Sequence, residues 1–304
     1  MPAWSPARYA AFAAERLRPA ADLLARVPAL SSSAPRIVDL GCGDGGPSSL
    51  LLDRFPSAHL HCVDSSPEML DAARTSLKGR AGSIEFVQAN FERPAEFGGG
   101  GGGQAESDSL HFDLCFANAS LHWCELSGGI PALLQRLIGR VVPGGCLAMQ
   151  VPDTRQQPSH ALLADCAAAV DPGGVAASLV APSNAHGPSE YCDALLGPLC
   201  SSLDMWSTTY VQRLEGEHAV FEYVRATGMR PYIEALGGEG SEAARAFEEE
   251  YKLRAAEAYP RRADGTTLFP FNRFFLVALR PSLIDVYAEY ADYHNHQLDK
   301  GWKS

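Results

Sequence analysis

Residues 38–50 read VDLGCGDGGPSSL, and they set the frame for the rest of the chain. The apolar run RIVD at 36–39 predicts a short buried strand, and residues 48–52 begin an apolar helix. Four glycines separate the two elements: Gly41, Gly43, Gly45 and Gly46. Glycines allow positive φ angles and close approach of a ligand, and the first N–H groups of a helix point toward that ligand. This strand, turn and helix therefore predict a site for a nucleotide-like cofactor.

Two classes of cofactor fit this turn. The glycines satisfy the dinucleotide pattern G-x-G-x-x-G, which is weakly specific on its own. Asp39, two residues before the first glycine, would bring like charge to a pyrophosphate and instead suits a cationic ligand. S-adenosylmethionine carries an ammonium and a sulfonium. Asp64 follows the strand-like run 59–63 and supplies an acceptor for a ribose diol 19 residues after Gly45. A plain turn with two helix-capping acids is the structural alternative.

The form D-x-G-x-G-x-G at 39–45, followed by D-S-S-P-E-M-L at 64–70, resembles the class I S-adenosylmethionine-dependent methyltransferases. The resemblance implies that residues at the ends of the first four strands hold the cofactor. These residues are Asp39, Gly41, Cys42, Gly43, Asp44, Gly45, Asp64, Ser65, Met69, Asn90, Phe91, Asn118, Ala119 and Ser120.

The ends of the third and fourth strands carry the rest of this resemblance. Asn90 stands where the family commonly has an acid near the adenine, although its side-chain carbonyl can still accept from the adenine amine. Phe91 either packs against the adenine or belongs to the core. In methyltransferases the end of the fourth strand faces the transferred methyl group, so His122 and Trp123 are candidates for the reaction chamber. His122 is either a general base or, as we expect, one wall of a site that works by positioning alone.

The pattern along the chain predicts an α/β fold. Strands and helices alternate in the way that produces a parallel sheet with right-handed crossovers. The expected strands are residues 36–39, 59–63, 83–88, 111–117, 146–151, 204–214 and 269–279. Expected helices include 67–77, 130–141, 218–236, interrupted at Arg230-Pro231, 241–258 and 282–300. We therefore expect a Rossmann-like seven-stranded methyltransferase sheet flanked by helices, with a helical cap over the strand ends.

The expected organisation is a single methyltransferase domain over residues 1–304. Its parts are an N-terminal lid helix (1–30), a cofactor-binding core (36–151), cap segments with the last two strands (152–280) and a C-terminal helical extension (281–304). Residues 98–103 are six consecutive glycines and predict a surface insertion.

The composition of the chain limits the classes of molecule that the protein is expected to bind. A net charge of −11 and a pI near 5.3 disfavour nucleic acid, because phosphate binding needs a basic face. Eight cysteines without a C-x-x-C pair predict reduced core thiols, and we expect no metal. Neither a signal-like apolar segment nor 18 consecutive apolar residues occurs, so we expect no membrane partner and a cytoplasmic location. The oligomeric state is expected to be a monomer or a homodimer.

Five further segments narrow the resemblance. They are WSPARYAAFAAERLRPAADLLARVP at 4–28, ANASLHW at 117–123, WSTTY at 206–210, ATGMRPY at 226–232 and FPFNRFFLVALR at 269–280. Together they are similar to the trans-aconitate methyltransferases, over most of residues 1–280. The glycine run, Asn90 and the tail after Arg280 depart from that family.

The narrower resemblance implies methyl transfer from S-adenosylmethionine to a carboxylate of trans-aconitate, with a monomethyl ester and S-adenosylhomocysteine as products. One alternative is another small polycarboxylate, such as cis-aconitate or isopropylmalate, and another is a non-catalytic S-adenosylmethionine-binding module. The expected substrate-binding residues are Trp4, Tyr9, Phe12, Arg16, Trp123, Tyr210, Arg230 and Arg273. The three arginines interrupt apolar or aromatic neighbourhoods, and arginine matches carboxylates bidentately. The aromatic face of the first helix is equally consistent with plain packing over the sheet.

Overall fold

The computed structural model describes residues 13–97, 111–179, 186–196, 199–226 and 228–285, with side chains from residue 17 on, residue 95 excepted. The described residues form two compact units. The first, here called the glycine-turn unit, comprises residues 20–150, 186–205 and those from 275 on. The second, called the aromatic unit, comprises residues up to 19, 151–185 and 206–274. The domain parts expected from the sequence remain a prediction.

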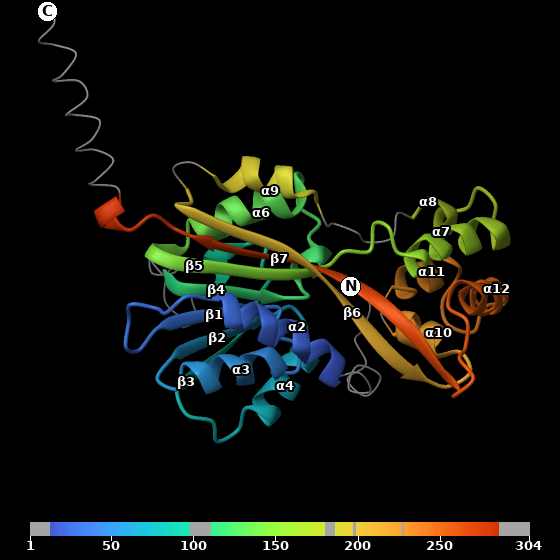
Figure 1. The fold of residues 1–304 in the computed structure, drawn as a ribbon, viewed down its shortest axis with the longest axis horizontal. Coiled ribbons are helices and arrows are strands. Elements are labelled where there is room, and N and C mark those ends of the chain that lie inside the picture. Colours follow the sequence, from blue (N-terminus) through green and yellow to red (C-terminus); the bar gives the residue numbers. More distant parts are fainter. Residues whose placement is uncertain (1–12, 98–110, 180–185, 197–198, 227, 286–304) are drawn as a thin grey trace, which may run out of the picture. The chain divides into compact units, whose positions relative to one another are not determined.

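The secondary structure alternates as expected (Figure 1). The strands are β1 (Arg36–Leu40), β2 (His59–Asp64), β3 (Ser83–Gln88), β4 (Phe112–Asn118), β5 (Val141–Pro152), β6 (Ser202–Glu215) and β7 (Thr266–Leu279). The helices are α2 (Ala13–Arg26), α3 (Gly46–Arg54), α4 (Pro67–Ser76), α6 (Gly129–Ile138), α7 (Pro158–Val170), α8 (Val175–Ser178), α9 (Pro188–Leu195), α10 (Ala219–Arg225), α11 (Arg230–Ala235) and α12 (Glu242–Ala258). Short 3-10 helices lie at η1 (Pro94–Phe97) and η2 (Leu121–Trp123).

The seven strands form one sheet in the order β3-β2-β1-β4-β5-β7-β6 (Figure 1). β1 pairs in parallel with β2, from Arg36 opposite His59 to Leu40 opposite Val63, and with β4 on its other side. β4 in turn pairs in parallel with β5. The chain runs outward from β1 to β3 and then returns to β4, so the carboxyl ends of β1 and β4 form the switch point where open α/β sheets bind ligands.

β7 runs against its neighbours. Its Arg280 end pairs with Gly145, whereas Asn272 pairs with Asp153, so residue numbers fall along β7 as they rise along β5. The backbone N–H of Ser201, just before β6, likewise donates to Leu279 at the end of β7. A seven-stranded mixed sheet with flanking helices is thus confirmed.

The glycine-turn unit is built on strands that are apolar on both faces. In β1, Ile37, Val38 and Leu40 are all fully buried, as expected for a central parallel strand covered by helices on each side. α6 presents Leu133 and Leu137, both fully buried, to this core.

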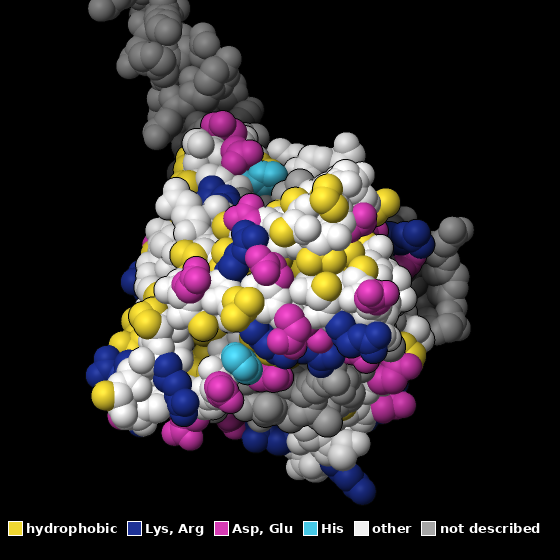
Figure 2. Space-filling view, turned by 90° about the vertical axis from the view of Figure 1, so that its right-hand side faces the viewer, with side chains coloured by type: hydrophobic (Ala, Val, Ile, Leu, Met, Phe, Trp, Pro, Cys, Tyr) yellow, Lys and Arg dark blue, Asp and Glu magenta, His cyan; other side chains and the backbone are white. Residues whose placement is uncertain are grey.

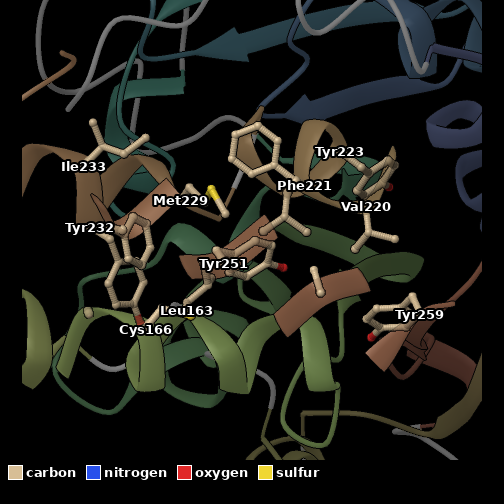
Figure 3. Packing of buried hydrophobic residues seen from close by; sticks show 14 of the residues in the cluster. Leu163, Cys166, Val220, Phe221, Tyr223, Met229, Tyr232, Ile233, Tyr251 and Tyr259 are labelled. Carbon is tan, nitrogen blue, oxygen red and sulfur yellow. The ribbon is translucent and has the colours of Figure 1, made fainter. Parts of the chain in front are cut away.

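The aromatic unit has a core of rings (Figure 3). Tyr232 of α11 stacks on Phe247 of α12 with centroids 5.8 Å apart, and Tyr223 of α10 meets Phe269 of β7 edge-on at 5.1 Å. The hydroxyl of Tyr251 donates to the carbonyl oxygen of Ser159 at 2.8 Å, which satisfies its polar end as buried tyrosines require. This network joins α7 to the helices after β6.

The surface of the helical end of the aromatic unit carries acidic and basic side chains intermixed (Figure 2). On α12, Lys252 bonds Glu249 at 2.6 Å, and Arg254 bonds Glu250 at 2.6 Å. Such exposed pairs are worth about 0–1 kcal/mol each and mark a solvated face. Among the described residues, no helix is both long and apolar enough to cross a membrane.

Several element boundaries differ from those expected. β5 begins at Val141 and not at residue 146, because Val141 pairs with Phe112 of β4 and the N–H of Gly144 bonds the carbonyl oxygens just after β7. The interrupted helix expected at 218–236 is two helices, α10 and α11. The expected helix 282–300 lies mostly outside the described residues.

Candidate functional site

The glycines of the turn after β1 have two different roles. Gly41, Gly43 and Gly45 have φ angles of 72°, 57° and 87°. A Cβ on Gly41 would lie 2.4 Å from the Cβ of Ser120, and one on Gly45 would lie 2.7 Å from the Oγ of Ser76, so both positions are closed by packing. A Cβ on Gly43 would meet no atom within 4 Å. Gly43 is therefore the point at which the turn presents bare backbone to open space.

Asp39 is buried beneath this turn, with 1% of its surface exposed. Its Oδ2 accepts a hydrogen bond from Ser48 of α3 at 2.6 Å, and its Oδ1 is buried without a hydrogen-bond partner. Burial raises the pKa of Asp39 to about 7; the Ser48 hydrogen bond opposes that shift and the neighbouring Asp64 adds to it. This carboxyl is therefore poised to respond to a positive charge.

Asp64, at the end of β2, is held by two backbone donors. Its Oδ2 accepts from the N–H of Gly43 at 3.0 Å, and its Oδ1 accepts from the N–H of Ser66 at 2.9 Å. Ser66 in turn caps α4 by accepting from the N–H of Met69 at 3.2 Å. Burial raises the pKa of Asp64 and the backbone hydrogen bonds oppose that shift. The cap, the carboxylate and the glycine turn thus form one connected arrangement at the ends of β1 and β2.

Asn90 follows β3 at the same edge of the sheet. Its Oδ1 accepts from the N–H of Glu92 at 2.9 Å, and the preceding Ala89 donates its N–H to the carbonyl oxygen of Asp64 at 3.1 Å. The side-chain carbonyl thus already stabilises its own turn and keeps one lone pair for an adenine amine. Phe91 is partly buried.

The end of β4 completes this edge. Asn118 has a buried Oδ1 with no hydrogen-bond partner, and Ala119 adopts a φ of 53°, which is uncommon for a residue with a side chain. The N–H of Ala119 donates to Gln150 of β5 at 2.9 Å, and the Oγ of Ser120 donates to the carbonyl oxygen of Leu40 at 2.5 Å. Strain held by neighbouring elements is typical of a functional position.

The candidates for the reaction chamber lie on η2, directly after β4. The rings of His122 and Trp123 are tilted against each other with centroids 4.9 Å apart, and both side chains are partly buried. They belong to the glycine-turn unit, together with the residues expected to bind the cofactor.

The other expected substrate residues belong to different parts of the chain. Trp4, Tyr9, Phe12 and the side chain of Arg16 lie outside the described residues. The remaining three, Tyr210 on β6, Arg230 at the start of α11 and Arg273 on β7, belong to the aromatic unit. Tyr210 is 4% exposed, and the guanidinium of Arg18 lies 5.1 Å from the centroid of its ring.

Arg273 lies in an aromatic setting that also contains a histidine. Only 5% of Arg273 is exposed, and its guanidinium carbon is 4.8 Å from the ring centroid of Phe271. His160 of α7 lies 6.0 Å from the same ring, and its Nδ1 is 3.1 Å from the Oγ of Ser159. Burial first, and the charge of Arg273 second, lower the pKa of His160 to about 4, so the imidazole is neutral at physiological pH.

His160 was not predicted from the sequence. It lies in the segment QQPSHALLADC, which reads as cap structure of mixed composition, and no motif singles it out. The one local signal was Pro158, which favours the first position of a helix and so places the histidine in the first turn of α7.

Comparison with known proteins decides the family. A relative from Methylobacterium nodulans, named trans-aconitate 2-methyltransferase, is 42% identical over 91% of this chain and 98% of its own length. Relatives of the same name from Azoarcus sp. and Streptomyces coelicolor are 40% and 39% identical, each over 92% of this chain and over 100% and 88% of their own lengths. The chain belongs to the trans-aconitate 2-methyltransferase family. The family expected from the sequence is thereby confirmed.

Two further comparisons concern the domain and the fold. A family model described as a methyltransferase domain matches residues 38–147, which run from β1 into β5. The solved structure of the YcgJ protein from Bacillus subtilis aligns over 87% of this chain and 99% of its own, with a TM-score of 0.50 at 12% identity, and therefore shows the fold alone. Membership of this family and the methyltransferase domain support S-adenosylmethionine as the cofactor, as expected from the sequence. The individual residue roles remain predictions.

Proposed function

We propose that this protein transfers the methyl group of S-adenosylmethionine to a carboxylate of trans-aconitate, giving a monomethyl ester and S-adenosylhomocysteine. The similarity of 42% over nearly the whole of both chains to a relative of that name carries the proposal. The protein acts on a small polycarboxylate, as a monomer or homodimer. The eight cysteines, all free thiols, fit the expected cytoplasmic location.

The edge of the sheet at the glycine turn fits the cofactor. Asp64, already fixed by two backbone donors, retains lone pairs for the ribose hydroxyls, and Gly43 leaves open space for adjacent atoms. The unpartnered oxygens of Asp39 and Asn118 suit the positive charge and donors of the methionine part. Asn90 is the proposed acceptor for the adenine amine. When bound, S-adenosylmethionine supplies an electrophilic methyl group on its sulfonium.

The remaining cofactor residues are proposed by position. Gly41, Cys42, Asp44 and Gly45 belong to the turn, Ser65 and Met69 follow Asp64, Phe91 follows Asn90 on the adenine side, and Ala119 and Ser120 follow Asn118.

The acceptor asks little of acid–base catalysis. A carboxylate ionised at neutral pH is already a nucleophile, so the protein has to align its oxygen with the methyl carbon at roughly 3 Å and exclude water. His122 and Trp123 then serve as walls of the reaction chamber. Arg230 and Arg273 of the aromatic unit, with Arg16, neutralise the acceptor's charge.

A panel of acids tests this function. The purified protein is incubated with S-adenosylmethionine and trans-aconitate, cis-aconitate, isopropylmalate or a monocarboxylate, while S-adenosylhomocysteine release is measured and the products are identified by mass spectrometry. We expect the highest kcat/KM on trans-aconitate and a monomethyl ester as product. A preference for another acid would assign a sibling substrate. Tight cofactor binding without turnover on any acid would reduce the protein to a binding module.

A further inference from the structure

The cluster around Arg273 contains a donor that the family resemblance does not assign. Its members come from three elements of the aromatic unit: His160 with Ser159 on α7, Phe271 with Arg273 on β7, and Gly228 just before α11. Phe271 lies next to both side chains: its ring centroid is 4.8 Å from the guanidinium carbon of Arg273 and 6.0 Å from the ring centroid of His160.

The imidazole of His160 is neutral and oriented. Arg273 is the charged group that acts on it among the described residues, and a second positive charge beside that guanidinium would be repelled. The Ser159 hydroxyl, 3.1 Å away, can donate to Nδ1 of the neutral ring. With Ser159 as the donor in this hydrogen bond, the proton of His160 lies on Nε2, and Nε2 is then a hydrogen-bond donor.

The backbone of Gly228 lies close to Nε2 of His160, where a side chain would press on the ring. A Cβ at this position would lie 3.3 Å from Nε2 of His160 and 3.4 Å from a methyl carbon of Leu163. The backbone of Gly228 is outside the left-handed region, so its φ angle does not call for glycine there. The lack of a side chain therefore allows this backbone segment to approach His160. Arg230, expected to bind the acceptor, follows two residues later in the same segment.

We propose that His160 is an acceptor-binding residue, whose Nε2–H donates to the carboxylate of the acceptor that also meets Arg273. The inference rests on the proposed function and extends it to a named residue. His160 offers a neutral N–H donor, and Arg273 offers N–H donors and a single positive charge. Together they match one carboxylate, which carries a single negative charge, so no second cation is needed. The pair therefore selects acceptors that carry a carboxylate beyond the one that is methylated.

Matched substitutions test the donor. His160→Leu removes the N–H, whereas His160→Gln keeps an amide donor close to the position of Nε2. We expect His160→Leu to raise the KM for trans-aconitate at least tenfold with kcat within about threefold and unchanged affinity for S-adenosylmethionine. His160→Gln should stay within about threefold of wild type. The control is His218→Leu, at an exposed histidine of the same unit, which should have no effect.

A direct readout covers the case in which His160→Leu fails to fold. In wild-type protein saturated with S-adenosylhomocysteine and labelled with nitrogen-15 in its histidines, trans-aconitate should shift the Nε2 resonance of His160, assigned by its loss in His160→Gln. An unmoved resonance overturns the inference, as does a folded His160→Leu variant with wild-type KM. Those results leave the proposed function intact. If the wild-type protein turns over no polycarboxylate, both the inference about His160 and the proposed function are wrong.

Discussion

At the scale of single residues, burial changes the pKa of two neighbouring carboxyl groups whose hydrogen-bond partners differ. Burial raises the pKa of both Asp39 and Asp64. Asp64 accepts two backbone N–H groups, whereas Asp39 has one serine hydroxyl and one oxygen without a partner. The first is therefore a preformed acceptor for neutral hydroxyls, and the second a charge-responsive group below the turn.

Replacement of Asp64 should weaken cofactor binding. Asp64→Ala removes the acceptor expected to hold the ribose diol, and we expect a loss of about 1–3 kcal/mol, or roughly five- to 150-fold in the Kd for S-adenosylmethionine by calorimetry. Asp71→Ala, which removes an exposed acid on α4 paired with Arg74, is the control and should bind normally. A folded Asp64→Ala variant with wild-type affinity would contradict the assigned role.

Asp39 should make cofactor binding depend on pH. Its folded pKa of about 7 lies above the ordinary value of 3.8, so its contribution to stability is fully present below pH 3.8 and is lost as pH rises through 7. A cationic ligand favours the ionised form, so affinity for S-adenosylmethionine should rise about five- to tenfold from pH 6 to pH 8. Asp39→Asn should lack this rise. Parallel pH profiles of the two proteins would refute the coupling.

What the sequence revealed at this scale depends on local motifs. Asp39, Asp64 and the glycines were predictable because strand, turn and acid follow one another within a short segment. His160 was not, because its significance depends on Arg273, more than a hundred residues later in the chain. The sequence also did not predict that the side-chain carbonyl of Asn90, expected to face the adenine, accepts a hydrogen bond from the N–H of Glu92.

At the scale of elements, the alternating pattern predicted the central strands closely. β1, β2 and β3 follow continuous apolar runs that end at turn residues, so their periodicity is a sufficient signal. β5 was mislocated at its start because Pro143-Gly144-Gly145 reads locally as a turn, while pairing of Val141 with β4 and bonds to the chain just after β7 extend the strand through it. Long-range pairing leaves no mark in a local pattern.

The glycine turn itself gives an element-scale prediction with an internal control. Gly41→Ala combines a φ of 72° with a Cβ 2.4 Å from Ser120, so we expect a large drop in Tm or failure to fold. Gly43→Ala meets no atom and should cost only about 1–2 kcal/mol of left-handed strain. Its methyl group would nevertheless enter the space open to the cofactor, so the Kd for S-adenosylmethionine should rise at least tenfold.

Thermal unfolding and calorimetry separate these two outcomes. Gly43→Asn, which tolerates the left-handed conformation better, should restore stability without restoring cofactor affinity. Normal binding by a folded Gly43→Ala variant would show that the open space at this position is not used.

At the scale of the whole molecule, the seven strands and their helices form two compact units, and each unit is built from three chain segments. Alternation predicted the parallel strands of the first unit, but the aromatic unit depends on α7 contacting helices that follow β6, as the bond from Tyr251 to Ser159 shows. That packing joins side chains nearly a hundred residues apart, and no period in the sequence encodes it. The helices of this unit were therefore predictable from the sequence, but their packing against one another was not.

The acidic character of the chain sets the last problem, the binding of a polyanion by a protein of net charge −11. Local arginines in apolar surroundings are the physical solution, since a guanidinium there is desolvated and interacts strongly with carboxylate. Arg273 fits this description with 5% exposure over Phe271, and Arg230 is partly buried at the start of α11. Arg16 is the third member expected from the sequence.

Each arginine should therefore contribute to acceptor affinity and not to cofactor affinity. Arg230→Gln and Arg273→Gln should each raise the KM for trans-aconitate tenfold or more, equivalent to about 1.4 kcal/mol or above, at unchanged Kd for S-adenosylmethionine. A dicarboxylate that lacks the matching group should suffer less. Arg245→Gln, at an exposed position on α12, is the matched control. If both folded variants, and Arg16→Gln with them, keep wild-type kcat/KM, the acceptor's charge must be neutralised by other residues.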